Sequence, residues 1–182
     1  MKNACTFTGP KPTRFKFKYN EDYKLCKKLK KVILTQMKRL YNEKGVRRFY
    51  VTGAIGVHMW AGELALQLKS LPGYGDIELV VVLPFPGYDA QWDIRSKKRM
   101  EALIQNSTEC LTLGKSASQE NYVLANRYFA DHAQFLIAVS DHADALPADM
   151  TQMEAYALQK GLGVIFIHPD TVETKGVFSE SL

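Results

Sequence analysis

The chain has 182 residues, of which 46% are hydrophobic and 24% are charged, and it carries a formal net charge of +5. These values are typical of an ordinary globular protein, and the length is sufficient for one buried core, so we expect a single domain over residues 1–182. No apolar run reaches the roughly 20 residues that span a bilayer, and the start lacks the apolar stretch of a secretory signal, so we expect a cytoplasmic protein without a membrane partner.

Predicted strands and helices alternate along the chain. Apolar runs predict strands at residues 4–8, 48–52, 77–83, 109–113, 135–139 and 163–168. Helical periodicity predicts helices at about residues 21–42, 57–69, 92–105, 119–132 and 150–160. Residues 79–83 contain no polar side chain, which predicts a strand buried on both faces. The alternation predicts an α/β fold, a Rossmann-like, doubly wound, mostly parallel sheet with helices on both faces.

The loop after the first predicted strand carries groups that suit an anion. Thr8 offers a hydroxyl, Gly9 allows close backbone approach, and Lys11 and Arg14 carry positive charge. Two prolines stiffen the loop, which lowers the entropy lost on binding. The alternative is a rigid turn with solvated basic side chains. We favour binding because a second Thr-Gly pair follows the next predicted strand.

The first predicted helix has one strongly basic face and one apolar stripe. Its basic residues are Lys24, Lys27, Lys28, Lys30, Lys31, Lys38 and Arg39. This pattern is typical of a solvated outer face, and the alternative is a platform for a polyanion such as nucleic acid or membrane headgroups. No aromatic side chain interleaves on the charged helix face, although a surface that stacks single strands needs them.

A glycine-containing turn, Thr52-Gly53-Ala54-Ile55-Gly56, joins the second predicted strand to its helix. Such a turn aims backbone N–H groups and a helix dipole at one point, where a phosphate can bind. The alternative is a tight turn whose glycines serve steric needs alone. On the binding interpretation, we expect Gly53→Val to abolish ligand binding while the fold survives.

Four further side chains are candidates, two in the helix after the glycine-containing turn and two before the fifth predicted strand. The indole of Trp60 suits either stacking on a base or anchoring the core, and Glu63 suits either a ribose hydroxyl or an exposed helix surface. Asn126 and Arg127 precede the fifth predicted strand. Both suit a position facing the ligand, and Arg127 alternatively suits pairing with Asp131 at i+4.

The longest polar stretch, at residues 140–149, follows the fifth predicted strand and lies in a candidate loop at residues 140–151. Open α/β sheets bind ligands beyond the carboxyl ends of their strands. Carboxylates that suit ribose binding or general-base work there are Asp141, Asp144, Asp149 and Glu154. The cluster Ser140-Asp141-His142 carries little weight, because adjacent loop residues rarely face one another. No nucleophile elbow, Walker loop or Ser-His-Asp set is present, and the scattered cysteines and histidines predict no metal site.

Taken as a set, four segments resemble the YpsA-like family of SLOG-domain proteins, the superfamily that groups DprA with the LOG nucleotide hydrolases. These segments are residues 5–12, residues 52–63, residues 83–85 with 91–92, and residues 126–132. The resemblance implies a Rossmann-like fold with a pocket for a nucleotide or a nucleotide-derived ligand such as ADP-ribose or NAD. It also implies a homo-oligomer as an expectation, because pairing through exposed apolar helices is common in the superfamily.

The chain departs from the patterns of these families at several positions. Pro10 and Lys11 replace the His and Arg of the usual first loop, and His58 replaces an acidic residue. The Pro-Gly-Gly-x-Gly-Thr-x-x-Glu stretch of LOG-type enzymes is matched at Thr151 and Glu154, but its glycines are missing. The upstream Arg of those enzymes falls at Ala125, with Arg127 out of register. These losses argue against carrying over the N-glycosidic hydrolysis of LOG enzymes.

We therefore expect a nucleotide-binding sensor or regulator that requires no cofactor. The loops at residues 8–12 and 52–56 would hold phosphate, Thr151 and Glu154 would hold ribose or phosphate, and Asn126 and Arg127 would close the site. One alternative is a nucleoside-monophosphate phosphoribohydrolase in which Glu154 is catalytic and polarises the sugar or guides water. Another is DprA-like binding of single-stranded DNA by the basic face of the first helix.

Overall fold

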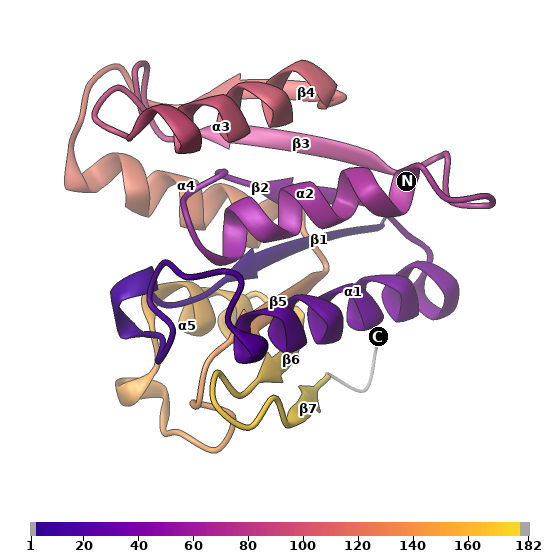
Figure 1. The fold of residues 1–182 in the computed structure, drawn as a ribbon. Helices are drawn as coiled ribbons and strands as arrows, with labels where there is room; N and C mark the ends of the chain where they lie inside the picture. Colours follow the sequence, from indigo (N-terminus) through magenta and orange to yellow (C-terminus); the bar gives the residue numbers. More distant parts are fainter. Residues whose placement is uncertain (1–2, 179–182) are drawn as a thin grey trace.

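The structure, a computed structural model, describes residues 3–178 and contains one seven-stranded sheet. The strands run in the order β4-β3-β2-β1-β5-β6-β7 (Figure 1). All neighbouring pairs are parallel except β6 and β7, which are antiparallel. The strands are β1 (Asn3–Thr8), β2 (Val46–Val51), β3 (Glu78–Leu83), β4 (Glu109–Thr112), β5 (Phe135–Val139), β6 (Gly163–Ile167) and β7 (Thr174–Val177).

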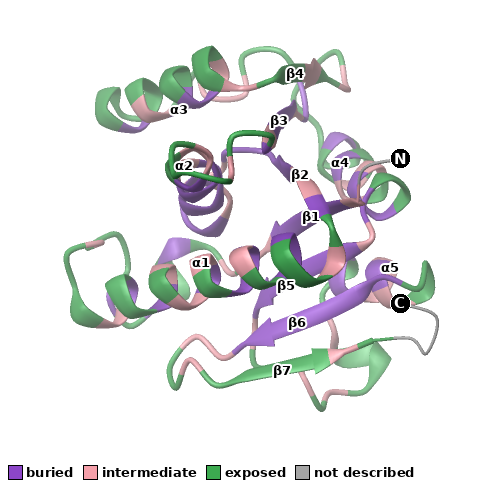
Figure 2. Ribbon diagram, turned by 90° about the vertical axis from the view of Figure 1, so that its right-hand side faces the viewer, coloured by how far each residue is buried: buried purple, intermediate pink, exposed green. Residues whose placement is uncertain are grey.

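Helices cover both faces of this sheet, as Figure 2 shows. On one face lie α1 (Lys24–Lys44), α2 (Val57–Lys69) and α3 (Ile94–Asn106). On the other lie α4 (Gln119–His132) and α5 (Gln152–Gln159). Two short 3-10 helices, η1 (Pro12–Arg14) and η2 (Pro147–Asp149), lie in loops. The predicted doubly wound α/β fold is thus confirmed, and the strand order reverses between β1 and β5.

The centre of β3 and the whole of β5 and β6 carry no polar side chain, because both sheet faces are buried there. In β3, Leu79 and Val81 belong to the core under α1–α3, whereas Val80 and Val82 belong to the core under α4 and α5. All four are at most 1% exposed, which confirms the prediction for this segment. Alternate side chains of a strand point to opposite faces, so a strand between two helix layers needs apolar residues at every position.

Two elements differ from the sequence prediction. The strand β7 was not predicted. Its four residues lie at the sheet edge and are mostly exposed, so they carry no apolar pattern. The first helix begins at Lys24 rather than at residue 21, because residues 20–23 form a turn in which the Tyr23 amide donates to the Asn20 carbonyl. Among residues 3–178, no helix is both long enough and apolar enough to cross a membrane.

Gly53 serves the packing of α3. Its φ is +79°, and a Cβ atom there would lie 2.3 Å from Sδ of Met100. A larger residue would therefore displace the buried Met100 side chain. Gly53→Val would therefore destabilise the fold as well as alter the turn, so a loss of binding in that variant would not isolate a ligand-binding effect.

We expect Gly53→Ala to lower the free energy of unfolding more than Gly73→Ala does. Gly73 also has a positive φ, +89°, but a Cβ there meets no atom within 4 Å. Both variants carry the left-handed backbone cost of about 1–2 kcal/mol, and overlap with Met100 adds about 1–3 kcal/mol at Gly53 alone. Urea unfolding of the two variants measures the difference, and equal losses would contradict the packing role.

Candidate ligand-binding site

A cavity of about 300 Å³ lies at the carboxyl ends of β1, β5 and β6. This is the point where the strand order reverses, the usual ligand site of open α/β sheets. Loops from both halves of the fold contribute, together with the start of α5. The lining residues are Thr8, Gly9, Pro10, Arg14, Val139, Ser140, Asp141, His142, Thr151, Glu154, Pro169 and Asp170.

The loop after β1 reaches the cavity because it packs tightly on the start of α2. A Cβ atom on Gly9 would lie 2.2 Å from Cγ2 of Val57, so only glycine fits at this contact. The loop then turns through η1, where the Arg14 amide donates to the Lys11 carbonyl at 2.9 Å. Thr8, Gly9 and Arg14 line the cavity as predicted, whereas the exposed Lys11 does not.

The Arg14 side chain is available to a ligand. Its guanidinium forms no hydrogen bond or ion pair with any residue that the structure describes, and the side chain is exposed. A guanidinium pairs with phosphate or carboxylate through two parallel N–H···O bonds. Arg14 is therefore the strongest anion-binding group in the cavity.

Thr151 and Glu154 join the cavity through a capping box at the start of α5. Oγ1 of Thr151 accepts from the Glu154 amide at 3.2 Å, and Oε2 of Glu154 accepts from the Thr151 amide at 3.1 Å. The Glu154 residue is only 1% exposed. Its other oxygen, Oε1, has no partner among the described residues, so it can accept a hydrogen bond from a ligand.

His142, which the sequence offered little reason to select, lines the cavity together with Ser140 and Asp141. Its Nδ1 lies 2.9 Å from Oε2 of Glu154, and its Nε2 lies 3.4 Å from Oδ1 of Asp141. The His142 amide donates to Oγ of Ser140 at 3.1 Å, which fixes the turn. The cluster at residues 140–142 is therefore not a Ser-His-Asp set, and the shortest side-chain contact of His142 is with Glu154, twelve positions away in the sequence.

The turn at residues 52–56 lies beside the cavity without lining it. A Cβ on Gly56 would lie 3.4 Å from Cγ of Pro12, so the turn packs against the loop after β1. Within the turn, the Ala54 amide donates to Oγ1 of Thr52 at 3.2 Å, and the Thr52 amide donates to Nδ1 of His58 at 3.1 Å. Two amides of the predicted phosphate nest are therefore already bonded, and a phosphate role for this turn stays a prediction.

Trp60 and Glu63 belong to the packing around the cavity loop and do not line the cavity. Trp60 is 2% exposed, and its ring centroid lies 5.3 Å from that of Phe15 and 6.1 Å from that of Phe17. Glu63 forms an ion pair with Arg99 of α3. These contacts favour the core and surface interpretations of both residues.

Asn126 and Arg127 face α5 rather than the cavity. Nδ2 of Asn126 donates to Oε1 of Gln152 at 3.2 Å, and Nε of Arg127 donates to the Tyr156 hydroxyl at 3.3 Å. The alternative pairing of Arg127 with Asp131 is wrong, because Asp131 pairs with Lys160 at 2.9 Å.

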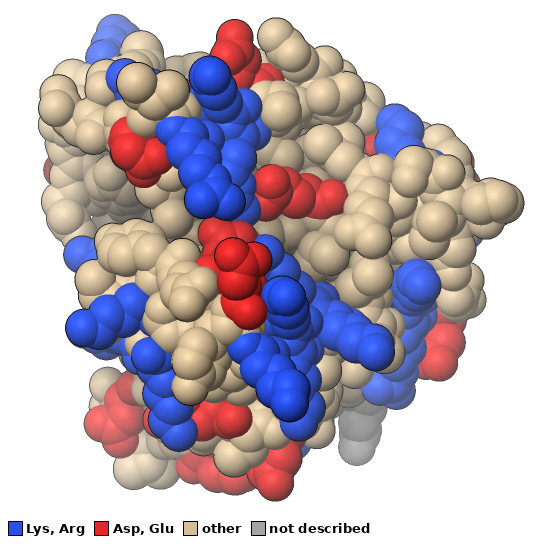
Figure 3. All heavy atoms as spheres, in the orientation of Figure 1, with Lys and Arg blue, Asp and Glu red and all other residues tan. Residues whose placement is uncertain are grey.

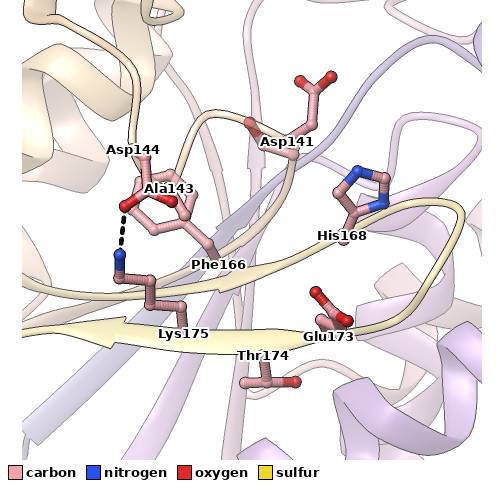
Figure 4. Close-up of a pocket in the computed structure, with 9 residues that line it drawn as sticks. Asp141, Ala143, Asp144, Phe166, His168, Glu173, Thr174 and Lys175 are labelled. Atoms are coloured by element: carbon pink, nitrogen blue, oxygen red, sulfur yellow. Dashed lines mark hydrogen bonds and ion pairs between the residues drawn. The ribbon is translucent and has the colours of Figure 1, made fainter.

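A second hollow of about 480 Å³ adjoins the cavity and shares Ser140 and Asp141 with it. It lies between the loop after β5 and the β6–β7 hairpin, and Lys175 and Asp144 point toward each other across it in an ion pair (Figure 4). At its rim, Nδ1 of His168 accepts from the amides of residues 170 and 171 at 3.1 and 3.2 Å. These bonds hold the loop that brings Asp170 to the first cavity.

The parallel sheet, its strand order and a cavity at the reversal define a Rossmann-like α/β protein. The chain belongs to the YspA SLOG family, whose model matches residues 5–172. This finding confirms the resemblance to YpsA-like proteins.

Relatives support the same assignment. A UPF0398 protein of Bacillus licheniformis is 28% identical over 136 residues, which cover 74% of this chain and 72% of that protein. A UPF0398 protein of Staphylococcus epidermidis is 24% identical over 145 residues, which cover 78% of this chain and 76% of that protein. The names of these relatives state no activity, so the comparisons establish the family.

We expect His58 to make the protein less stable in acid. Burial lowers the pKa of His58 to about 4, and its Nδ1 accepts the Thr52 amide, so the folded state holds the neutral ring. The unfolded chain takes up this proton below about pH 6.5, so the free energy of unfolding falls as the pH drops from about 6.5 toward 4. The upper limit of this loss is about 3 kcal/mol.

Urea unfolding across this pH range, in the wild type and in His58→Asn, measures the contribution. The asparagine Oδ1 can accept the same amide bond and does not titrate, so the variant should lose less stability in acid. His132→Asn, at an exposed histidine of α4, serves as the control and should keep the wild-type profile. Parallel profiles for wild type and His58→Asn would contradict the assignment.

Proposed function

We propose that the cavity binds the phosphate and ribose of a nucleotide or nucleotide-derived ligand, such as AMP, ADP-ribose or NAD, and that the protein is a sensor or regulator. The observation that carries this proposal is that Arg14, whose guanidinium has no partner among residues 3–178, lines the same cavity as the buried Glu154 with its free Oε1. Arg14 supplies a bidentate partner for phosphate, and Thr8 adds a hydroxyl. Glu154 supplies an acceptor for a ribose hydroxyl.

The size of the site fits this class of ligand. A volume of about 300 Å³ stands at the lower end of small-molecule pockets and suits one nucleotide. The adjoining hollow of about 480 Å³ shares a wall with the cavity and offers room for the second half of ADP-ribose or NAD. Asp141 lies on the shared wall, where its carboxylate can accept from a ribose of either half.

Glu154 is better suited to binding than to hydrolysis. Its Oε2 already accepts from the Thr151 amide and contacts Nδ1 of His142, so the carboxylate is held as part of the start of α5. The phosphoribohydrolase alternative assigns catalysis to the same residue. It predicts release of free base from AMP, a product that the binding proposal does not require.

We expect Arg14→Gln to weaken binding of AMP and ADP-ribose by roughly 10- to 150-fold, the loss that corresponds to about 1.5–3 kcal/mol for hydrogen bonds to a charged group. Arg95→Gln is the matched control, because Arg95 is exposed on α3 and does not line the cavity. Calorimetry gives the affinities, and a ligand at 100 times its dissociation constant should add about 2.7 kcal/mol to wild-type stability.

Equal affinity in Arg14→Gln and in the wild type would contradict the proposed phosphate contact. The same samples, analysed for free base by chromatography, test the enzyme alternative. Release of base from AMP in the wild type and its loss in Glu154→Gln would replace the sensor proposal with hydrolysis.

A second candidate function, binding of single-stranded nucleic acid, is favoured by the surface of α1. Four exposed lysines at positions i, i+3, i+4 and i+7 share one helix face, and none pairs with an acid in the described part of the chain: Lys24, Lys27, Lys28 and Lys31. Figure 3 shows Lys and Arg gathered over α1 and the segment before it. Tyr19 and Tyr23 precede the helix and are 62% and 51% exposed, so aromatic rings do accompany the charges. Cations with exposed aromatics form the usual surface for single strands.

We expect Lys27→Glu with Lys28→Glu to abolish binding of a labelled oligo-dT, measured by fluorescence anisotropy. Lys97→Glu with Lys98→Glu, an equal charge change on exposed positions of α3, should bind as the wild type does. Four phosphate contacts give a slope of about −3 for log affinity against log salt. Tyr19→Ala should weaken binding roughly 5- to 150-fold through lost stacking.

Equal losses in the two lysine pairs would mean that net charge alone attracts the strand. A wild-type protein that does not bind oligo-dT at low salt would exclude this second function.

A further inference from the structure

The imidazole of His142 is held between two carboxylates at the cavity wall. Its Nδ1 lies 2.9 Å from Oε2 of Glu154, and its Nε2 lies 3.4 Å from Oδ1 of Asp141. Glu154 is 1% exposed and is fixed by the Thr151 amide, so it cannot move away from the ring. The ring is thus oriented by a buried group while its side chain remains 32% exposed toward the cavity.

Charged groups from every element around the ring decide what its protonation does. The loop after β5 supplies Asp141, α5 supplies Glu154, and the loop after β6 supplies Asp170, whose carboxylate lies 3.8 Å from Nζ of Lys16. The loop after β1 supplies the unpaired Arg14. Three carboxylates therefore line a cavity in which Arg14 is the one arginine or lysine among the described lining residues.

This balance opposes an anionic ligand when His142 is neutral. The neutral ring that donates from Nδ1 to Glu154 leaves Nε2 without a proton beside the Asp141 carboxylate. The protonated ring donates from both nitrogens, bonds Glu154, and offers its second N–H to Asp141 or to a phosphate oxygen. The added positive charge also offsets one of the cavity carboxylates.

We infer that binding of an anionic nucleotide in this cavity is coupled to uptake of one proton by His142. The inference rests on the proposed function and adds that ligand affinity is regulated by pH. Histidine is the side chain whose unperturbed form changes charge between about pH 5 and 8, so the test covers that range. Because the protonated ring favours the ligand, affinity falls as the pH rises, by up to about tenfold per pH unit for one proton.

The test measures the affinity for ADP-ribose and NAD by calorimetry between about pH 5.5 and 8.5, where histidine titrates. These ligands carry a pyrophosphate diester whose charge is constant over the range, whereas the phosphate monoester of AMP titrates near pH 6. We expect the wild type to bind at least about tenfold more weakly at the alkaline end. Repeating the titrations in buffers with different ionisation enthalpies counts the protons taken up, and about one is expected.

Two substitutions separate charge from shape. His142→Asn can still donate to Glu154 and never carries a charge, so its affinity should be independent of pH and equal to the wild-type value at alkaline pH. His142→Lys carries a charge throughout, so its affinity should be independent of pH and near the wild-type value at acidic pH. His132→Asn is the control at an exposed histidine outside the cavity, and it should keep the wild-type pH dependence. Circular dichroism confirms that each variant is folded.

The outcomes distinguish this inference from the proposed function. If ADP-ribose or NAD binds with an affinity that is constant over the range, or if His142→Asn keeps the wild-type pH dependence, the proton coupling is overturned and the binding site stands. If neither ligand binds at any pH, the proposed function fails, and the coupling fails with it.

Discussion

The position of β1 in the sheet is the constraint on which the cavity depends. β1 pairs in parallel with β2 on one side and with β5 on the other, and the strand order reverses between β1 and β5. The chain leaves β1 toward the helix layer of α1 and leaves β5 toward the layer of α5, so neither connection covers the space between the two strand ends. The close contact of Gly9 with Val57 then fixes the position of the loop after β1 relative to that space.

A single buried carboxylate connects the start of α5 to the chemistry of the cavity. Burying an ionised group is unfavourable unless it is hydrogen-bonded, and Glu154 meets this condition through the Thr151 amide and His142. The same oxygen therefore caps a helix and orients the imidazole. A ligand or proton that changes the charge at His142 acts directly on the group that holds the start of α5. For this reason the site is suited to a regulatory response as well as to binding.

Much of the fold could be predicted from sequence because its elements are strongly patterned. The predicted boundaries of α4 and β5 match the structure, and every parallel strand was found. The strand-end rule also identified the loops that carry Thr8, Arg14, Asp141 and Glu154 to one cavity. β7 was missed because an exposed edge strand of four residues has no apolar periodicity.

Side-chain direction was harder to predict than loop position. Trp60 and Glu63 follow the glycine turn at the carboxyl end of β2. Trp60 lies on the buried face of α2 and enters the core, whereas Glu63 forms an ion pair with Arg99. The contact of His142 with Glu154 joins residues of a loop and a helix, and no spacing rule predicts it. Gly53 illustrates a third limit. A positive φ favours glycine whether packing or a ligand requires it, so the sequence alone does not separate the two reasons.

Two residues that were expected to touch a ligand and do not line the cavity, Trp60 and Glu63, are instead connected to the segment at residues 9–23. This segment has no strand and only one short 3-10 helix, yet it is held at two points. Phe15 and Phe17 stack on each other and pack against Trp60, and the Glu21 carboxylate forms an ion pair with Arg99, which also pairs with Glu63.

Together with the contact of Gly9 with Val57, these anchors restrict the backbone that presents Arg14, so less conformational entropy is lost when the guanidinium meets an anion. The same anchors place Tyr19 and Tyr23 next to the lysines of α1. Trp60 and Glu63 are thus positioning residues for both proposed surfaces. In both proposals they act through the rigidity of this segment and not through contact with a ligand.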